Sequence, residues 1–98
     1  MAKVIGPFTA DELNAISHCT LLKVYGSLTP SMETNAVVKL YHSATAAGKL
    51  LYQRAGNMEG GEGGVLPFEF AFGDGITVGR TGISLSITNV AQVFLLIN

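Results

Sequence analysis

The stretch Ile83–Asn98, with the sequence ISLSITNVAQVFLLIN, decides the fold of this chain. Over 83–88, apolar residues alternate with hydroxyl residues, which predicts a strand with one face in the core and the other in water. Val93–Ile97 is apolar on both faces, which predicts a strand that is covered on both sides. A domain of this size has one core, so the second face needs a further cover. Another copy, a shell surface, or a lid formed by residues 1–16 could supply it.

The composition is that of a small domain with little charge. The chain has 98 residues, of which 48% are hydrophobic and 13% are charged, against about 25% charged in typical soluble domains. A surface so short of charge indicates either partners that hide it or a β surface rich in Ser, Thr and Gly. The net charge is −1 and no basic stripe or polybasic cluster is present. We therefore expect no nucleic-acid binding and no membrane binding.

Cysteine usage and the N-terminus both favour synthesis in the cytoplasm. Cys19 is the only cysteine, so no intrachain disulfide can form, as is usual for proteins of a reducing compartment. The apolar stretch Met1–Ile5 is too short for a secretory signal and is broken by Gly6 and Pro7. No apolar run approaches the ~18 residues of a membrane-spanning helix.

Strand signals recur along the chain at the spacing of roughly ten residues that is typical of a β-sandwich or barrel. A hairpin between two of these strands is expected at 36–42 and 49–54. Residues 55–64 are predicted to form a glycine-rich loop. The expected strands lie at 19–28, 36–42, 49–54, 65–72, 76–78, 83–88 and 93–97.

The strand patterns also predict which side chains enter the core. Phe68, Phe70 and Phe72 fall on one face of 65–72, and we expect them to supply a large part of the core. Within 19–28, strict alternation places Leu22 with Val24 on one face. Leu21, Lys23 and Tyr25 then lie on the other face.

Residues 1–18 leave several structures open. Residues 1–8 could form a strand or an extended arm, and 1–18 as a whole could act as an arm or a lid. Thr9-Ala10-Asp11-Glu12 has the pattern of a capping box, which predicts one or two helical turns over 10–16, with an extended segment as the alternative. The predicted fold is one all-β domain over 1–98. It is a small antiparallel β-sandwich, jelly-roll or Ig-like, of seven or eight short strands with at most one short N-terminal helical turn.

Residues able to carry catalysis or bind a metal are few. A zinc site or a Cys–His nucleophile pair would have to use His18, Cys19 and His42. His18 and Cys19 are neighbours, so in a strand their side chains point to opposite faces. The glycines of 60–64 are not followed by the Lys-Ser/Thr of a phosphate-binding loop. We predict no catalytic, cofactor-binding or metal site, and a protein that is not an enzyme.

The tyrosines offer an alternative function. Tyr25, Tyr41 and Tyr52 could together form a ligand or partner surface, because an exposed tyrosine combines an apolar ring with a polar tip. In that case the chain would be a carbohydrate- or peptide-binding β-sandwich module.

The order of motifs in residues 36–98 resembles that of short structural proteins of tailed bacteriophages and prophages. The motifs are AVVKLYH at 36–42, ATAAGKLL at 44–51, FEF at 68–70, GITV at 75–78, TGISLSI at 81–87 and the apolar closing strand. The resemblance implies a β-sandwich that assembles on a virion as a capsid decoration, head fibre, or neck or tail component. It implies capsid or tail proteins as partners, and it carries over no catalytic residue.

The closing strand is the expected interface of the homo-oligomer. One of its faces, either Phe94 with Leu96 or Val93 with Leu95 and Ile97, packs the core, and the opposite face packs a neighbour. After synthesis in the host cytoplasm, such a subunit would reside in the virion.

Overall fold

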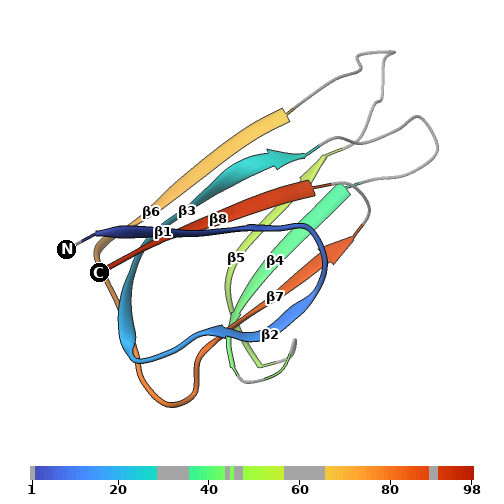
Figure 1. Ribbon diagram of the computed structural model, residues 1–98. Helices are drawn as coiled ribbons and strands as arrows, with labels where there is room; N and C mark the ends of the chain where they lie inside the picture. Colours follow the sequence, from blue (N-terminus) through green and yellow to red (C-terminus); the bar gives the residue numbers. More distant parts are fainter. Residues whose placement is uncertain (1, 29–35, 44, 46–47, 57–65, 89–90) are drawn as a thin grey trace, which may run out of the picture.

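The chain folds into two antiparallel sheets of four strands each, packed face to face (Figure 1). This computed structural model describes residues 2–28, 36–43, 45, 48–56, 66–88 and 91–98. No helix occurs within these ranges. The strands are β1 (Lys3–Phe8), β2 (Glu12–Ile16), β3 (Cys19–Leu28), β4 (Ala36–His42), β5 (Lys49–Gly56), β6 (Leu66–Val78), β7 (Ile83–Thr88) and β8 (Ala91–Ile97). The all-β sandwich predicted from the sequence is confirmed.

The strand order identifies the topology as a jelly roll. Sheet A has the order β1-β8-β3-β6 and sheet B the order β2-β7-β4-β5. The first strand pairs with the last, β2 with β7, β3 with β6, and β4 with β5, so the chain is one long hairpin. Pairing of β3 with β8 and of β4 with β7 rolls this hairpin into two sheets. Of the two predicted topologies, the jelly roll is the one observed.

The core lies between the sheets and is built from alternate residues of the central strands. In β4 and β7 the apolar side chains alternate toward the core as predicted, but Ser84, on the face of β7 that was expected in water, is fully buried. The predicted hairpin of 36–42 with 49–54 is the β4–β5 pair. Burying each large side chain stabilises the fold by roughly 1.5–3 kcal/mol. Core residues with no exposed surface are Leu21, Val24, Leu28, Ala36, Val38, Leu40, Ile83, Leu85, Val93 and Leu95.

The prediction for the three phenylalanines of β6 is only partly correct. Phe68 is 7% exposed, but Phe70 is 44% exposed and Phe72 is half-buried. The physical reason is that β6 is an edge strand of sheet A. Its inward face is covered on one flank only, where Tyr52 of β5 stacks on Phe68 and Phe70.

A β-bulge overturns the predicted faces of β3. The register of β3 against both neighbours shifts between Leu21 and Lys23. The extra residue turns Leu21 to the same side as Val24, and both are fully buried. Leu22, which the alternation placed on the same face as Val24, is half-buried.

Residues 1–18 form neither an arm nor a lid. β1 pairs with β8 in sheet A and β2 pairs with β7 in sheet B, so the segment crosses from one sheet to the other. Of the two structures expected for 10–16, the extended segment is observed and the helical turn is not, because backbone N–H groups of Gly82 and Ile87 hydrogen-bond to side chains of this region. Ile87 N donates to Asp11 Oδ1 (2.7 Å) and Gly82 N donates to Asn14 Oδ1 (3.0 Å).

The glycine-rich loop predicted at 55–64 lies mostly outside the described residues. Its first two residues, Ala55 and Gly56, are the end of β5.

Candidate interaction surface

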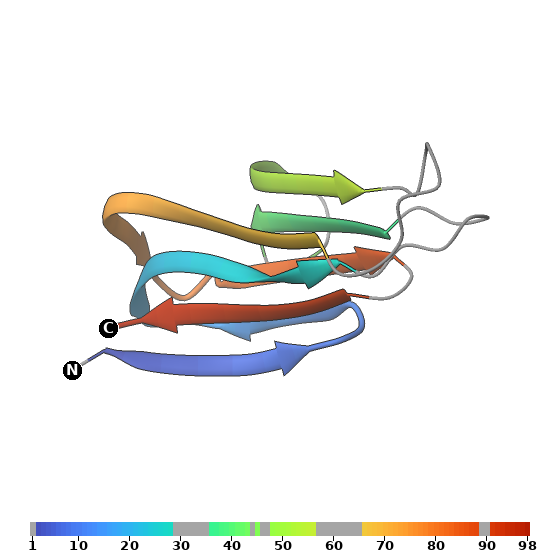
Figure 2. The ribbon, with the colours of Figure 1, turned by 90° about the horizontal axis from the view of Figure 1, so that it is seen from above.

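β8 is a central strand whose two faces have different surroundings. It lies between β1 and β3 in sheet A (Figure 2), so both of its backbone edges are paired. Val93 and Leu95 point into the sandwich and are fully buried. Phe94 and Leu96 are half-buried on the opposite, outer face. Of the two expected arrangements, the face with Val93 and Leu95 therefore packs the core, and half-buried Ile97 packs against it.

The outer face of sheet A carries an apolar patch centred on β8. Phe94 stacks on Tyr25 of β3, with ring centroids 5.3 Å apart and an interplanar angle of 15°. Leu96 lies opposite Val4 of β1, which is 51% exposed. We call Val4, Tyr25, Phe94 and Leu96 the outer patch.

Gly6 leaves room for one ring of the outer patch. A Cβ added at Gly6 would lie 3.2 Å from Phe94 Cδ1 and 2.8 Å from the Val93 carbonyl oxygen. The ring of Phe94 thus lies beside the glycine of the neighbouring edge strand, an arrangement that is known to compensate for edge glycines in sheets.

A charged pair borders the outer patch. Lys23 Nζ lies 2.9 Å from Glu69 Oε1 and 5.8 Å from the centroid of the Tyr25 ring. Both charged side chains are partly exposed, so the pair contributes at most about 1 kcal/mol to stability. Its effect is to place one cation and one anion beside the apolar surface, as at the rim of a protein interface.

No other strand of the described chain crosses this face of sheet A, as Figure 2 shows. The lid considered for residues 1–16 is therefore not what covers Phe94 and Leu96, because β1 extends the same sheet sideways and β2 belongs to sheet B.

The structure does not bring the three tyrosines together. Tyr25 is in the outer patch. Tyr41 lies opposite Ser84 on the outer face of sheet B. Tyr52 points inward from β5, and its ring is 6.0 Å from Phe68 and 5.2 Å from Phe70. Burial raises the pKa of Tyr52 and nearby Arg54 lowers it, with a net rise.

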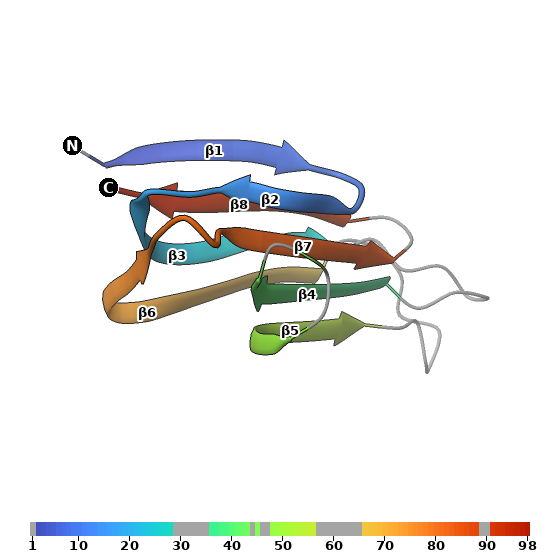
Figure 3. The ribbon, with the colours of Figure 1, turned by 90° about the horizontal axis from the view of Figure 1, so that it is seen from below.

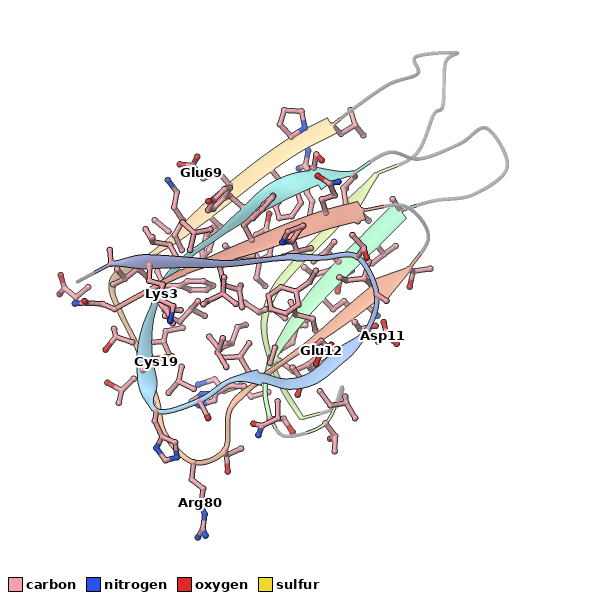
Figure 4. The ribbon with its side chains drawn as sticks, viewed as in Figure 1. Lys3, Asp11, Glu12, Cys19, Glu69 and Arg80 are labelled. Atoms are coloured by element: carbon pink, nitrogen blue, oxygen red, sulfur yellow. The ribbon has the colours of Figure 1, made fainter. Side chains whose placement is uncertain are left out.

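The titratable side chains are dispersed over the molecule. In Figure 4, Asp11 and Glu12 lie near β2, Glu69 lies on β6, and Arg80 points away from the turn before β7. In the part of the chain that the structure describes, no group of three or more His, Cys, Asp and Glu could hold a metal ion. His18 directly precedes β3, Cys19 is the first residue of β3, and His42 ends β4. Burial raises the pKa of the Cys19 thiol.

The sequence pattern missed two contributors to this surface. Val4 and Gly6 are brought beside β8 only by the pairing of the two chain ends, and nothing in their local sequence signals that pairing.

Comparisons of the chain with protein-family models, curated proteins and solved structures gave no match in any of the three. Among the described residues, no helix is long and apolar enough to span a membrane.

Proposed function

We propose that this chain is a non-enzymatic structural protein of a bacteriophage virion. It acts as a homo-oligomeric capsid decoration, head-fibre, or neck or tail component, assembled after synthesis in the host cytoplasm. The observation that carries the proposal is the outer patch, in which β8 presents Phe94 and Leu96 away from the core that its other face already fills.

The chemistry of the outer patch suits a protein partner. Interface centres are enriched in aromatic side chains and depleted of charge, with polar groups at the rim. The stacked pair of Tyr25 and Phe94 supplies the aromatic centre, and Lys23 with Glu69 supplies the rim. The jelly roll adds support, because viral capsid domains recur among its members, although one fold serves many functions.

The binding-module alternative receives less support. It requires Tyr25, Tyr41 and Tyr52 to share a surface, and they lie on the outer face of sheet A, the outer face of sheet B and the sandwich interior respectively.

The first test uses point variants in the outer patch. Deleting 94–98 would remove most of a central strand of sheet A, so that variant is expected to unfold and says little about assembly. Phe94→Ser and Leu96→Ser keep the inward face of β8 intact. We expect both variants to retain a β-type circular dichroism spectrum and to lose mass in light scattering.

Val37→Ser is the matched control. Val37 is also half-buried and lies on the outer face of sheet B, opposite Thr88. We expect its oligomer mass to equal that of the wild type. A wild-type chain that is monomeric at high micromolar concentration would contradict the homo-oligomer.

The second test addresses the virion. Labelled copies of the chain should be found on purified particles of the phage that encodes it, at a fixed number per particle. Particles that lack the protein would overturn the virion assignment while leaving the oligomer intact.

A further inference from the structure

The largest exposed apolar side chains lie on the edges of the sandwich. Among the described residues, four large hydrophobic side chains are at least 44% exposed, and each belongs to a different edge strand. Edge strands normally carry charge, proline or irregular backbone that discourages pairing with another chain. These side chains are Val4 on β1, Leu13 on β2, Leu50 on β5 and Phe70 on β6.

Both open sides carry some of these features. On the side formed by β5 and β6, β6 contains Pro67 near its start, and the register of β5 against β4 is irregular. On the side formed by β1 and β2, β1 contains Pro7, which lacks an N–H donor, and β2 contains Asn14 in the left-handed region (φ 53°) with an irregular register against β7. Residues 9–11 also join β1 to β2 directly on this side.

The other side, formed by β5 and β6 (Figure 3), has an aromatic cluster along its inner margin. Tyr52 stacks on Phe70 at 5.2 Å, and Phe70 meets Phe72 edge to face at 5.1 Å. Phe70 remains 44% exposed because nothing described lies beyond β6 in sheet A. A further strand at this edge would cover it.

The two edge strands of this side carry opposite charges. β5 contains Lys49 and Arg54 and no acid, whereas β6 contains Glu69 and Asp74 and no base. The strands also run in opposite directions, as Figures 1 and 2 show. β5 and β6 are therefore complementary both in charge and in antiparallel sense.

We propose that a second copy of this chain docks on the β5/β6 side about a two-fold axis parallel to the strands. This rotation places β5 of each copy beside β6 of the other, and the two contacts are equivalent. Sheet A of each copy continues into sheet B of the other. Inward faces stay inward, so the second copy's Tyr52 and Arg54 lie on the same face as Phe68, Phe70 and Phe72.

Charge distinguishes this arrangement from the other symmetric one. A two-fold axis perpendicular to the strands would pair β6 with β6 and β5 with β5. It would gather Glu69 and Asp74 of both copies in one ladder, and Lys49 and Arg54 of both in the other. Like charges gathered at one edge repel each other, and opposite charges on neighbouring strands attract each other. The β5–β6 arrangement is therefore favoured.

The axis also fixes which residues meet. A rotation about the strand direction keeps each residue at its own height. Tyr52 is level with Phe68 and Phe70 of its own chain. β5 has one extra residue between Leu50 and Tyr52, and the strands run oppositely, so the second copy's Leu50 falls level with Ala71. The same relation brings its Lys49 level with Phe72, two residues from Asp74.

This inference rests on the proposed function only in that the partner is another copy of the chain. The β5/β6 side and the outer patch are different surfaces, so variants can separate their effects.

Disulfide trapping tests the dimer. In a Cys19→Ser background, we would introduce Leu50→Cys and Ala71→Cys together. Within one copy these positions lie on the outer faces of different sheets, opposite Tyr41 and Lys23, so they cannot form a bridge. Across the proposed ladder they are close enough for a disulfide, since directly opposed Cα atoms are about 4.5–5.5 Å apart.

We expect the double variant to give a covalent dimer under mild oxidation, and an equal mixture of the two single variants to give one too. Each single variant alone should stay monomeric on a non-reducing gel. A dimer formed by Ala71→Cys alone would overturn the proposal in favour of β6–β6 pairing. Absence of any dimer from the double variant would overturn it as well.

Affinity measurements provide a second readout that does not depend on oxidation. Leu50→Glu places an acid on the exposed outward face beside the acidic β6 of the second copy, and it is expected to raise the dimer dissociation constant at least tenfold. Leu13→Glu on the opposite edge is the control and should leave the dissociation constant unchanged. Loss of assembly in Phe94→Ser with normal trapping between positions 50 and 71 would support both contacts. An unchanged dissociation constant in Leu50→Glu would contradict the β5/β6 contact alone.

Discussion

The buried hydroxyl of Ser84 is predicted to hold β2 onto sheet B, and Ser84→Ala tests this. Ser84 is fully buried although it points to the outer face of β7. Its Oγ accepts a hydrogen bond from Asn14 N (2.9 Å) and donates one to the Ser43 carbonyl oxygen (2.6 Å). One hydroxyl thus joins β2, β7 and the residue that follows β4.

The magnitude follows from these two bonds. Alanine removes both and leaves an N–H and a carbonyl group without their partner. A hydrogen bond contributes about 1 kcal/mol net, and an unsatisfied buried group costs about 1–3 kcal/mol. Asn14 is exposed, so water can reach its N–H, and we take the lower end for each group. The expected loss is about 2 kcal/mol of unfolding free energy, or about 8–12 °C in Tm for a domain of this size.

Urea unfolding followed by circular dichroism measures this loss, with the slope of the transition checked for constancy. Ser86→Ala is the matched control, because Ser86 lies two residues along the same face of β7 and is half-buried. We expect the control to change the unfolding free energy by less than about 0.5 kcal/mol. If Ser84→Ala costs no more than Ser86→Ala, the bridging role assigned to the hydroxyl is refuted.

Four further predictions concern the backbone and the single thiol. Gly26→Ala should cost more than about 3 kcal/mol of unfolding free energy, because its Cβ would clash with the Gln92 carbonyl oxygen. Gly79→Ala, whose Cβ would have nothing within 4 Å, should have a Tm near that of the wild type, and equal Tm values for the two variants would contradict the clash. Asn14→Ala should lower Tm more than Asn14→Gly, because only glycine adopts φ 53° freely; the reverse order would refute backbone strain as the cause. Burial raises the pKa of the Cys19 thiol above its ordinary value of 9.0, so native protein should react with a thiol reagent at pH 8 more slowly than unfolded protein. Because the pKa of Cys19 is higher in the folded protein, folding favours the protonated thiol. The stability that this thiol contributes is therefore complete below pH 9.0 and is lost as the pH rises through the folded pKa. An unfolding free energy that increased with pH above 9.0 would contradict this direction.

The candidate surface was predictable in part. That Val93–Ile97 is apolar on both faces is visible in the sequence, and so is the need for a second cover. The sequence does not show which face enters the core, because the pair Val93 and Leu95 is as apolar as the pair Phe94 and Leu96. The pairing with β3 decides it, since Val24 and Phe94 must lie on opposite sides of sheet A. The β5/β6 side was not predicted, because exposure of Phe70 depends on β6 being an edge strand.

Local pattern determined the class of the fold. Period-two alternation in β4 and β7, and turn residues between short apolar runs, suffice for a β-sandwich, because alternation places every second side chain on the core face whatever the strand order. Strand order, the bulge at Leu21 and the extended form of residues 10–16 were decided by tertiary structure. Each depends on partners distant in sequence: Ile97 opposite Leu21, and the N–H groups of Gly82 and Ile87 bound to Asn14 and Asp11. A short segment does not determine which distant strand will lie beside it. Hydrogen bonds from that strand can override the segment's own preference for a helical or extended backbone.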